Sequence, residues 1–116
     1  MLTLLVIDSI WLYGYKDTHK KVVEGVQQEP LSLNMQAGLL WYVLAAFGYS
    51  YFIKPFSKTK DEALKNGAIL GLLMYGTFDL VNKAIFINYP WEYAIKDTLW
   101  GSIAMGLASY ISYTNN

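Results

Sequence analysis

The chain has 116 residues, a length that predicts one domain, and 54% of its residues are hydrophobic while 16% are charged. This composition is more apolar than that of an ordinary soluble domain and favours a membrane protein. The formal net charge is zero, no long basic run occurs and no cysteine is present, which argues against nucleic-acid binding, a disulfide scaffold and a cysteine metal site. All of the basic residues are Lys, which is typical of an AT-rich genome such as that of a low-GC bacterium or a large DNA virus.

The first apolar segment runs from residue 1 to about residue 20. Its first 15 residues carry one charge, Asp8, and a full span requires continuation past Lys16 toward Lys20, with these lysine side chains extending toward water. A polar stretch follows, which predicts a water-exposed loop with the only histidine of the chain, His19, in contact with solvent. The second segment, residues 33–53, has no charged side chain over 21 positions, about the length that a helix needs to cross roughly 30 Å of hydrocarbon.

The third and fourth segments, residues 64–87 and 91–113, are separated by a short turn that contains Asn88 and Pro90. This spacing predicts an antiparallel helical hairpin. Tyrosine and tryptophan residues gather near the ends of the segments, as they do at the headgroup level of membranes. The sequence therefore predicts an all-α polytopic membrane protein, in which four transmembrane helices form a bundle of two antiparallel hairpins within a single domain, residues 1–116.

The expected location is an integral, multi-pass position in a membrane, with the lipid bilayer as the main partner. The loop at residues 54–65 holds four Lys against three in the first loop, which favours cytoplasmic termini under the positive-inside rule. Small residues let helices approach closely in lipid. Gly67 and Gly71 form a Gly-x-x-x-Gly pair in the third segment, and a stripe of small residues in the fourth consists of Gly101, Ala104 and Ala108. Both patterns predict packing within the hairpin or, as the alternative, a homodimer interface.

Three of the four segments carry an aspartate with a companion three residues later. Residues at i and i+3 share one face of a helix, so each companion is expected to point the same way as its aspartate. The pairs are Asp8 with Trp11, Asp79 with Asn82, and Asp97 with Trp100. Counted from the predicted helix ends, all three aspartates lie about 9 to 14 Å deep and are expected to share one layer.

An ionised carboxylate that faces lipid costs about 2.5–3.5 kcal/mol, so these aspartates are expected to face one another. Close carboxylates do not all ionise easily, so at least one is expected to hold a proton. The layer is then a site for a proton or a small cation. The alternative is a purely structural layer, in which Asp79 pairs with Lys83, Glu92 pairs with Lys96, and the aspartates bond across helices to tryptophan indoles or to the hydroxyls of Thr77 and Thr98.

Carboxylate and amide oxygens also suit a hard metal ion, but the sequence supplies too few ligands to place one, and no metal or cofactor is predicted. No nucleophile–base pattern or phosphate-binding loop occurs, so no catalytic residue is predicted.

The stretch "YGTFDLVNKAIFINYPWEYAIKDTLWGS" resembles the DUF2177 family of small predicted membrane proteins, and the likeness extends to "DSIWL" in the first segment. The resemblance implies four spans and important aspartates, and it implies no reaction. Lys83 and Val81 depart from the family pattern, which commonly has an apolar residue and a threonine there. The matching positions are Asp8, Trp11, Leu12, Tyr42, Gly48, Phe52, Pro55, Tyr75, Gly76, Thr77, Phe78, Asp79, Asn82, Asp97, Trp100 and Gly101.

Three functions stay open on this evidence. The first is transport or permeation of a proton or cation through the aspartate layer. The second is a structural or accessory role in a bacterial or viral membrane. The third is an enzyme that modifies a lipid or isoprenoid between the helices, with a carboxyl group as general acid.

Overall fold

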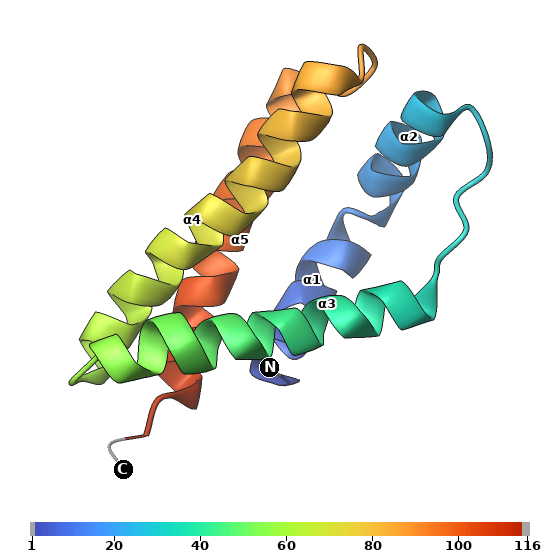
Figure 1. The fold of residues 1–116 in the computed structure, drawn as a ribbon. Coiled ribbons are helices and arrows are strands. Elements are labelled where there is room, and N and C mark those ends of the chain that lie inside the picture. Colours follow the sequence, from blue (N-terminus) through green and yellow to red (C-terminus); the bar gives the residue numbers. More distant parts are fainter. Residues whose placement is uncertain (1, 115–116) are drawn as a thin grey trace.

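A computed structural model describes residues 2–114, and every element in that range is helical. The order along the chain is α1 (Leu2–Gly14), α2 (Lys16–Gln27), α3 (Met35–Gly48), a π-helical turn η1 (Tyr49–Ile53), a 3₁₀ turn η2 (Lys54–Phe56), α4 (Lys60–Ile85) and α5 (Trp91–Ser112). Figure 1 shows α4 and α5 side by side, with α1 and α2 rising beside them and α3 lying across their lower ends. The all-α prediction is confirmed.

The antiparallel pair of α4 and α5 is the most closely packed part of the molecule, and it matches the hairpin predicted at residues 64–87 and 91–113. Helix α4 begins at Lys60 rather than near residue 64 because Thr59 caps it. The Thr59 hydroxyl accepts a hydrogen bond from the Glu62 amide at 3.1 Å, and the Glu62 carboxylate accepts one from the Lys58 amide. This reciprocal arrangement resembles a capping box, which fixes the start of a helix.

The continuous helix predicted over residues 1–20 is wrong, because α1 ends at Gly14 and a second helix follows Tyr15. The water-exposed loop predicted after it is also wrong over residues 16–27, which form α2. The apolar residues Val22 and Val26 lie four positions apart on one face of α2, and they pack with Tyr89, Tyr93 and Ala94. Burial of this face stabilises the helix. The many charged residues of α2 made the same stretch look like a loop in the sequence.

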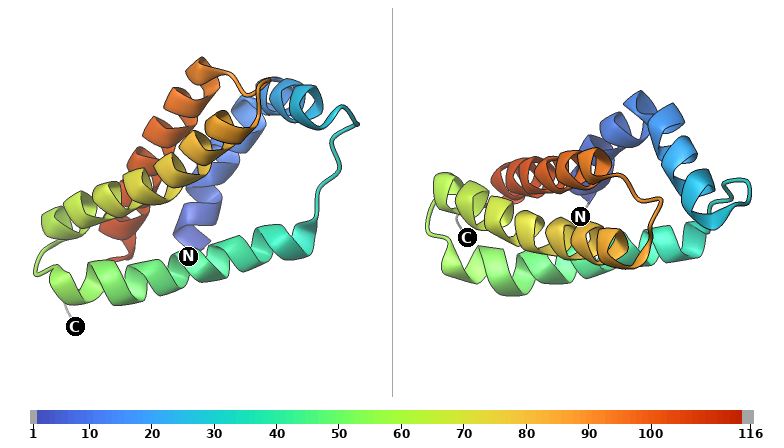
Figure 2. Two further views of the ribbon diagram at one scale, coloured as in Figure 1. Left: turned by 45° about the horizontal axis from the view of Figure 1, so that its top comes forward. Right: turned by 90° about the horizontal axis from the view of Figure 1, so that it is seen from above.

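The first of the two predicted hairpins is not formed. An extended connection after α2 leads to α3, which diverges from α1 and α2 and reaches α1 only near its own middle (Figures 1 and 2). Asn34 caps α3 by accepting a hydrogen bond from the Ala37 amide at 3.0 Å. The helix continues through the π-helical turn to Ile53, so the apolar segment predicted at residues 33–53 is helical over nearly its whole length.

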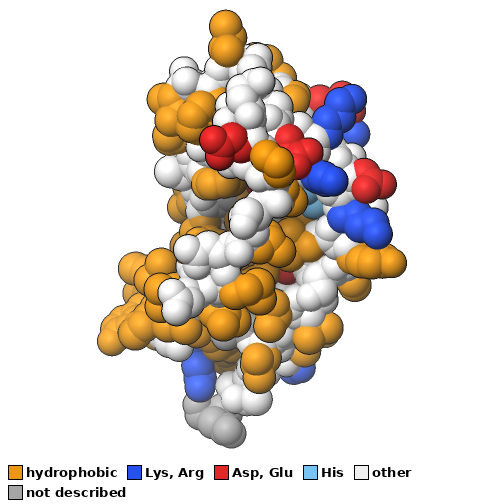
Figure 3. Space-filling view, turned by 90° about the vertical axis from the view of Figure 1, so that its right-hand side faces the viewer, with side chains coloured by type: hydrophobic (Ala, Val, Ile, Leu, Met, Phe, Trp, Pro, Cys, Tyr) orange, Lys and Arg blue, Asp and Glu red, His pale blue; other side chains and the backbone are white. Residues whose placement is uncertain are grey.

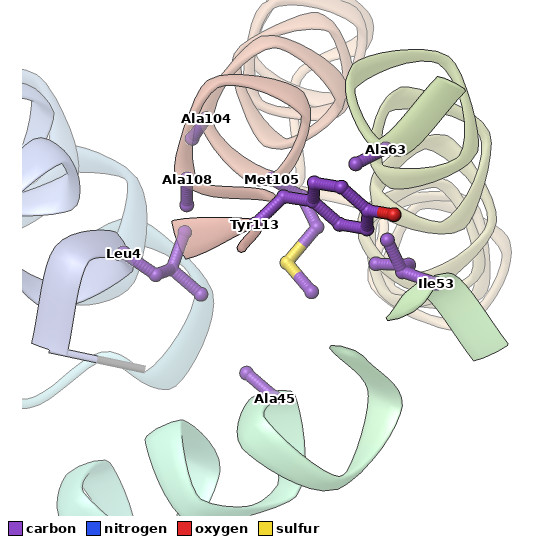
Figure 4. Close-up of a cluster of buried hydrophobic side chains, with 8 residues drawn as sticks. All are labelled: Leu4, Ala45, Ile53, Ala63, Ala104, Met105, Ala108 and Tyr113. Atoms are coloured by element: carbon purple, nitrogen blue, oxygen red, sulfur yellow. The ribbon is translucent and has the colours of Figure 1, made fainter. Parts of the chain in front are cut away.

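The interior consists mainly of small and polar side chains, and the large apolar side chains point outward. Figure 4 shows the core, in which Leu4, Ile53, Met105 and Tyr113 pack with Ala45, Ala63, Ala104 and Ala108. Leu2, Leu33, Leu73 and Ile87, by contrast, are each at least 60% exposed. Figure 3 shows that acidic and basic side chains gather over the upper part of the molecule, where α2 lies, and that hydrophobic side chains cover much of the rest of this face. Within the described residues, one helix, α4, is long and apolar enough to cross a membrane.

Candidate functional site

Helices α1 and α5 exchange tryptophan–aspartate hydrogen bonds. The indole N–H of Trp100 donates to Oδ1 of Asp8 at 2.9 Å, and the indole N–H of Trp11 donates to Oδ1 of Asp97 at 3.2 Å. Each helix carries its aspartate three residues before its tryptophan, so an antiparallel pair brings each indole level with the other helix's carboxyl group. The two indole rings stack, with centroids 5.3 Å apart and planes at 12°.

Asp8 receives a second hydrogen bond, from α3. The Tyr42 hydroxyl donates to Oδ2 of Asp8 at 2.6 Å, so three helices meet at this carboxyl group. Asp8 is 7% exposed, and hydrogen bonds to a buried carboxylate are stronger than those between neutral groups. Asp8 therefore anchors α1 to both α3 and α5.

Asp79 lies six residues before the end of α4, near the turn of the α4–α5 hairpin, and is fully buried. The Tyr89 hydroxyl donates to its Oδ1 at 2.5 Å, and the Thr98 hydroxyl donates to its Oδ2 at 3.1 Å. The half-buried side chain of Asn82 lies near the Tyr89 hydroxyl. Tyr89 reaches Asp79 because the turn after α4 folds its ring back into the hairpin, where the side chain is 5% exposed.

The side chains of Asp79 and Asp97 lie close enough to interact, and Thr98, which donates to Asp79, directly follows Asp97 on α5. Two carboxylates that lie close together repel one another, and a proton on either group relieves the repulsion. Asp8 is linked to Asp97 through the stacked indoles of Trp11 and Trp100, each of which donates to one of the two carboxyl groups. No group of three His or acidic side chains suited to a metal ion was found within residues 2–114.

Two expected partners of Asp79 lie elsewhere. The hydroxyl of Thr77 donates to the carbonyl of Leu73 at 2.6 Å on the exposed face of α4, so Thr77 is not part of the cluster. The Lys83 ammonium lies 5.7 Å from the centre of the Trp91 ring, and no ion pair of Lys83 with Asp79 was found in the described structure. The idea that Lys83 neutralises Asp79 is therefore wrong, and hydroxyl donors satisfy that carboxyl group instead.

The family model for DUF2177, described as a predicted membrane protein, matches residues 1–114. The chain belongs to the DUF2177 family. No curated protein and no solved structure matches it. The match covers all three aspartates, so the cluster lies within the part of the chain that this DUF2177 protein shares with the family model.

The predicted packing residues of this DUF2177 protein lie between its helices. A Cβ atom built on Gly67 would come within 2.7 Å of the Met105 carbonyl oxygen, and one built on Gly71 within 2.4 Å of the Gly101 carbonyl oxygen. Gly101 is itself covered by the ring of Tyr75, which leaves no room for a side chain. Ala104 and Ala108 are fully buried and belong to the same core cluster as Leu4 of α1.

His19 is not the solvated loop residue that the sequence predicted. It lies on α2 with its ring partly buried, Nε2 3.2 Å from the Trp11 carbonyl oxygen and Nδ1 2.5 Å from the Tyr93 hydroxyl. A carbonyl oxygen only accepts, so Nε2 carries a proton and donates it to the Trp11 carbonyl. Nδ1 then accepts from the Tyr93 hydroxyl. The spacing of His19, Val22 and Val26 on one face of α2 is the sequence signal that could have found this position.

Tyr42, Tyr89 and Tyr93 also contribute to the site, although sequence reasoning gave them no role in it. Their hydroxyls bond to Asp8, Asp79 and His19, respectively. Tyr89 and Tyr93 lie near a predicted membrane surface, where a tyrosine side chain can equally well face the headgroups. The sequence pattern therefore does not distinguish tyrosines that face headgroups from those that turn inward.

Proposed function

We propose that the four apolar segments, α1, α3 with η1, α4 and α5, lie in the bilayer and that α2 lies at its surface. The support is the distribution of side chains, with large apolar groups outside and small or polar groups inside. Helices in lipid associate through small residues and interhelical hydrogen bonds, and they need no large apolar core. Helix α3 is apolar on all its faces and mostly exposed, which suits immersion in hydrocarbon better than contact with water.

Within this arrangement, the pair of Asp79 and Asp97 is proposed as a proton-binding site. The observation that carries the proposal is that two buried carboxyl groups lie close enough to interact, in a site where no ion pair with a cation was found within residues 2–114. Two such carboxyl groups hold a single proton readily, because the two charges of the doubly ionised form repel one another and are poorly solvated. A proton is favoured over a metal cation because no group of three acidic or His side chains suited to a metal was found within residues 2–114.

A route from the polar end of the molecule to the pair is also available. Tyr93 lies one helical turn before Asp97 on α5, and its hydroxyl meets His19 of α2. The Tyr93 ring also contacts that of Tyr89 edge to face, with centroids 5.6 Å apart. An imidazole can donate at one ring nitrogen and accept at the other, and both nitrogens of His19 have partners, so this side chain is suited to pass protons toward the carboxyl pair. We therefore favour proton-linked permeation or transport.

The structural alternative is favoured by a different observation, the reciprocal bonds of Trp11 and Trp100. These indoles donate and do not accept, so they cannot relay a proton from Asp97 to Asp8. Their role is to hold α1 on α5. Asp8 is thus assigned to packing, Asp79 to the proton site, and Asp97 takes part in both.

The test is proton flux into liposomes that contain the purified chain, comparing the wild type with Asp79→Asn and Asp8→Asn. Flux that is lost in Asp79→Asn and kept in Asp8→Asn supports the proton site. Circular dichroism and melting in detergent must show that both variants fold. No flux in the wild type, or equal loss in two folded variants, would overturn the proposal and favour a structural role for the whole cluster.

A further inference from the structure

A cleft of about 580 Å³ lies between α2 and the beginning of α5. Its volume is within the range of about 300–1,000 Å³ typical of small-molecule sites. One wall is a stripe of α2 residues at helical spacing, Thr18, Lys21, Val22 and Gly25. The Asn88 side chain donates to the Gly25 carbonyl at 3.2 Å, which ties the end of α2 to the turn between α4 and α5 and closes one end of the cleft.

In the membrane arrangement proposed above, on which this inference rests, the cleft lies at the level of the lipid headgroups. Helix α2 is charged and amphipathic and directly follows the apolar α1, as in helices that lie in the membrane interface. The turn between α4 and α5 lies beside it, with Trp91 exposed and Lys83 over the Trp91 ring. Tryptophan and lysine at the end of a span mark the boundary between hydrocarbon and water.

The charges in the cleft favour a single negative charge. Lys21 of α2 and Lys96 of α5 both line it, and so does Glu92, whose carboxylate lies 2.7 Å from the Lys96 ammonium. Two cations and one anion leave one positive charge, which one phosphodiester would neutralise. Trp11, Tyr15 and Tyr93 supply aromatic walls beside these charges, suited to the glycerol and first acyl carbons of a lipid.

We propose that this cleft binds the headgroup of an anionic glycerophospholipid, with its phosphate between Lys21 and Lys96. Basic pockets at the ends of membrane helices recognise lipid phosphates in this way. The bound lipid would join α2 to α5, which otherwise meet mainly through Val22 and the partners of His19. The inference does not depend on the proton site, since neither lysine belongs to the aspartate cluster.

The experiment is a titration of the purified full-length chain in detergent with phosphatidylglycerol, with bound lipid counted by native mass spectrometry. Lys21→Gln and Lys96→Gln are each expected to weaken binding about fivefold to tenfold. Lys20→Gln, on the same helix but outside the cleft, is the matched control and should change binding less than twofold. Glu92→Gln removes the anion and should strengthen binding, a gain that misfolding cannot produce.

Two comparisons identify the ligand. Phosphatidylcholine carries an extra cation and is expected to bind more weakly than phosphatidylglycerol, and an excess of inorganic phosphate should not displace the bound lipid. Equal binding by the two lipids, equal effects of Lys20→Gln and Lys21→Gln, or unchanged binding in Glu92→Gln would each overturn the proposal. Displacement by inorganic phosphate would also overturn it, and would indicate a site for a free anion.

Discussion

Replacement of Gly71 by alanine tests the close approach of α4 and α5. A Cβ atom at this position would lie 2.4 Å from the Gly101 carbonyl oxygen and 2.7 Å from Cβ of Met105. Ordinary contacts begin at 3.4 Å, so the helices must separate by about 1 Å, the difference between 3.4 and 2.4 Å. A backbone oxygen cannot rotate away as a side chain can, so the strain falls on the helix pair itself.

The cost follows from three contributions. Overpacking of this kind destabilises a protein by about 1–3 kcal/mol. Separation also stretches the bond from the Ser102 hydroxyl to the Ala68 carbonyl, now 2.8 Å, and its loss adds about 0.5–1.5 kcal/mol. Alanine regains up to about 1 kcal/mol because it favours a helix more than glycine does. We expect a net loss of about 0.5–4.5 kcal/mol in the free energy of unfolding.

Gly38→Ala is the matched control, because Gly38 also lies in a helix and a Cβ atom there meets nothing within 4 Å. It should leave stability unchanged or raise it by up to about 1 kcal/mol. Both variants are unfolded by sodium dodecyl sulfate in mixed micelles and followed by circular dichroism. If Gly71→Ala proves as stable as Gly38→Ala, the close packing of α4 on α5 is refuted.

Two further substitutions test the hydrogen bonds of the cluster. Trp100→Phe keeps an aromatic ring against Trp11 but removes the donor to Asp8. It should lower the free energy of unfolding by about 1–3 kcal/mol in the same assay. A change below about 0.5 kcal/mol would contradict the hydrogen bond, since surface substitutions produce changes of that size. Lys83→Gln should lower the free energy of unfolding by about 1 kcal/mol or less, the value of a cation–π contact. It should leave proton flux unchanged. A loss of flux in this variant would indicate that Lys83 acts as the countercharge of Asp79 after all.

The helical hairpin and the burial of the three aspartates could be predicted from the sequence because both depend on local signals. Residues 64–87 and 91–113 are long apolar runs, and the turn residues between them are unambiguous. Asp8, Asp79 and Asp97 stand out because a charge is rare in such runs. The shared spacing from aspartate to companion also placed Trp11 and Trp100 on the faces of their helices that carry the aspartates, and each indole donates to the aspartate of the other helix.

The remaining features depend on contacts between distant parts of the chain. Helix α2 is stabilised by packing of Val22 near Tyr89 and Ala94, more than 60 residues away. The spacing of apolar residues on α2 indicates a buried face, but it does not identify what that face packs against. Lys83 lies four residues after Asp79, a spacing that favours an ion pair on an isolated helix. Tyr89 and Thr98 satisfy Asp79 instead, because the turn and the neighbouring helix place uncharged donors closer to the carboxyl group.

Asp97 belongs to both parts of the cluster, and this links the proposed proton site to the packing of α1. Its carboxyl group accepts from Trp11 and lies close enough to Asp79 to share a proton in the proposed site. An ionised acceptor binds an indole N–H more strongly than a neutral one. When the shared proton lies on Asp97, the Trp11 bond is therefore expected to weaken, while Tyr42 and Trp100 still hold Asp8. A proton would then loosen the end of α1 next to α2 and leave its other end in place.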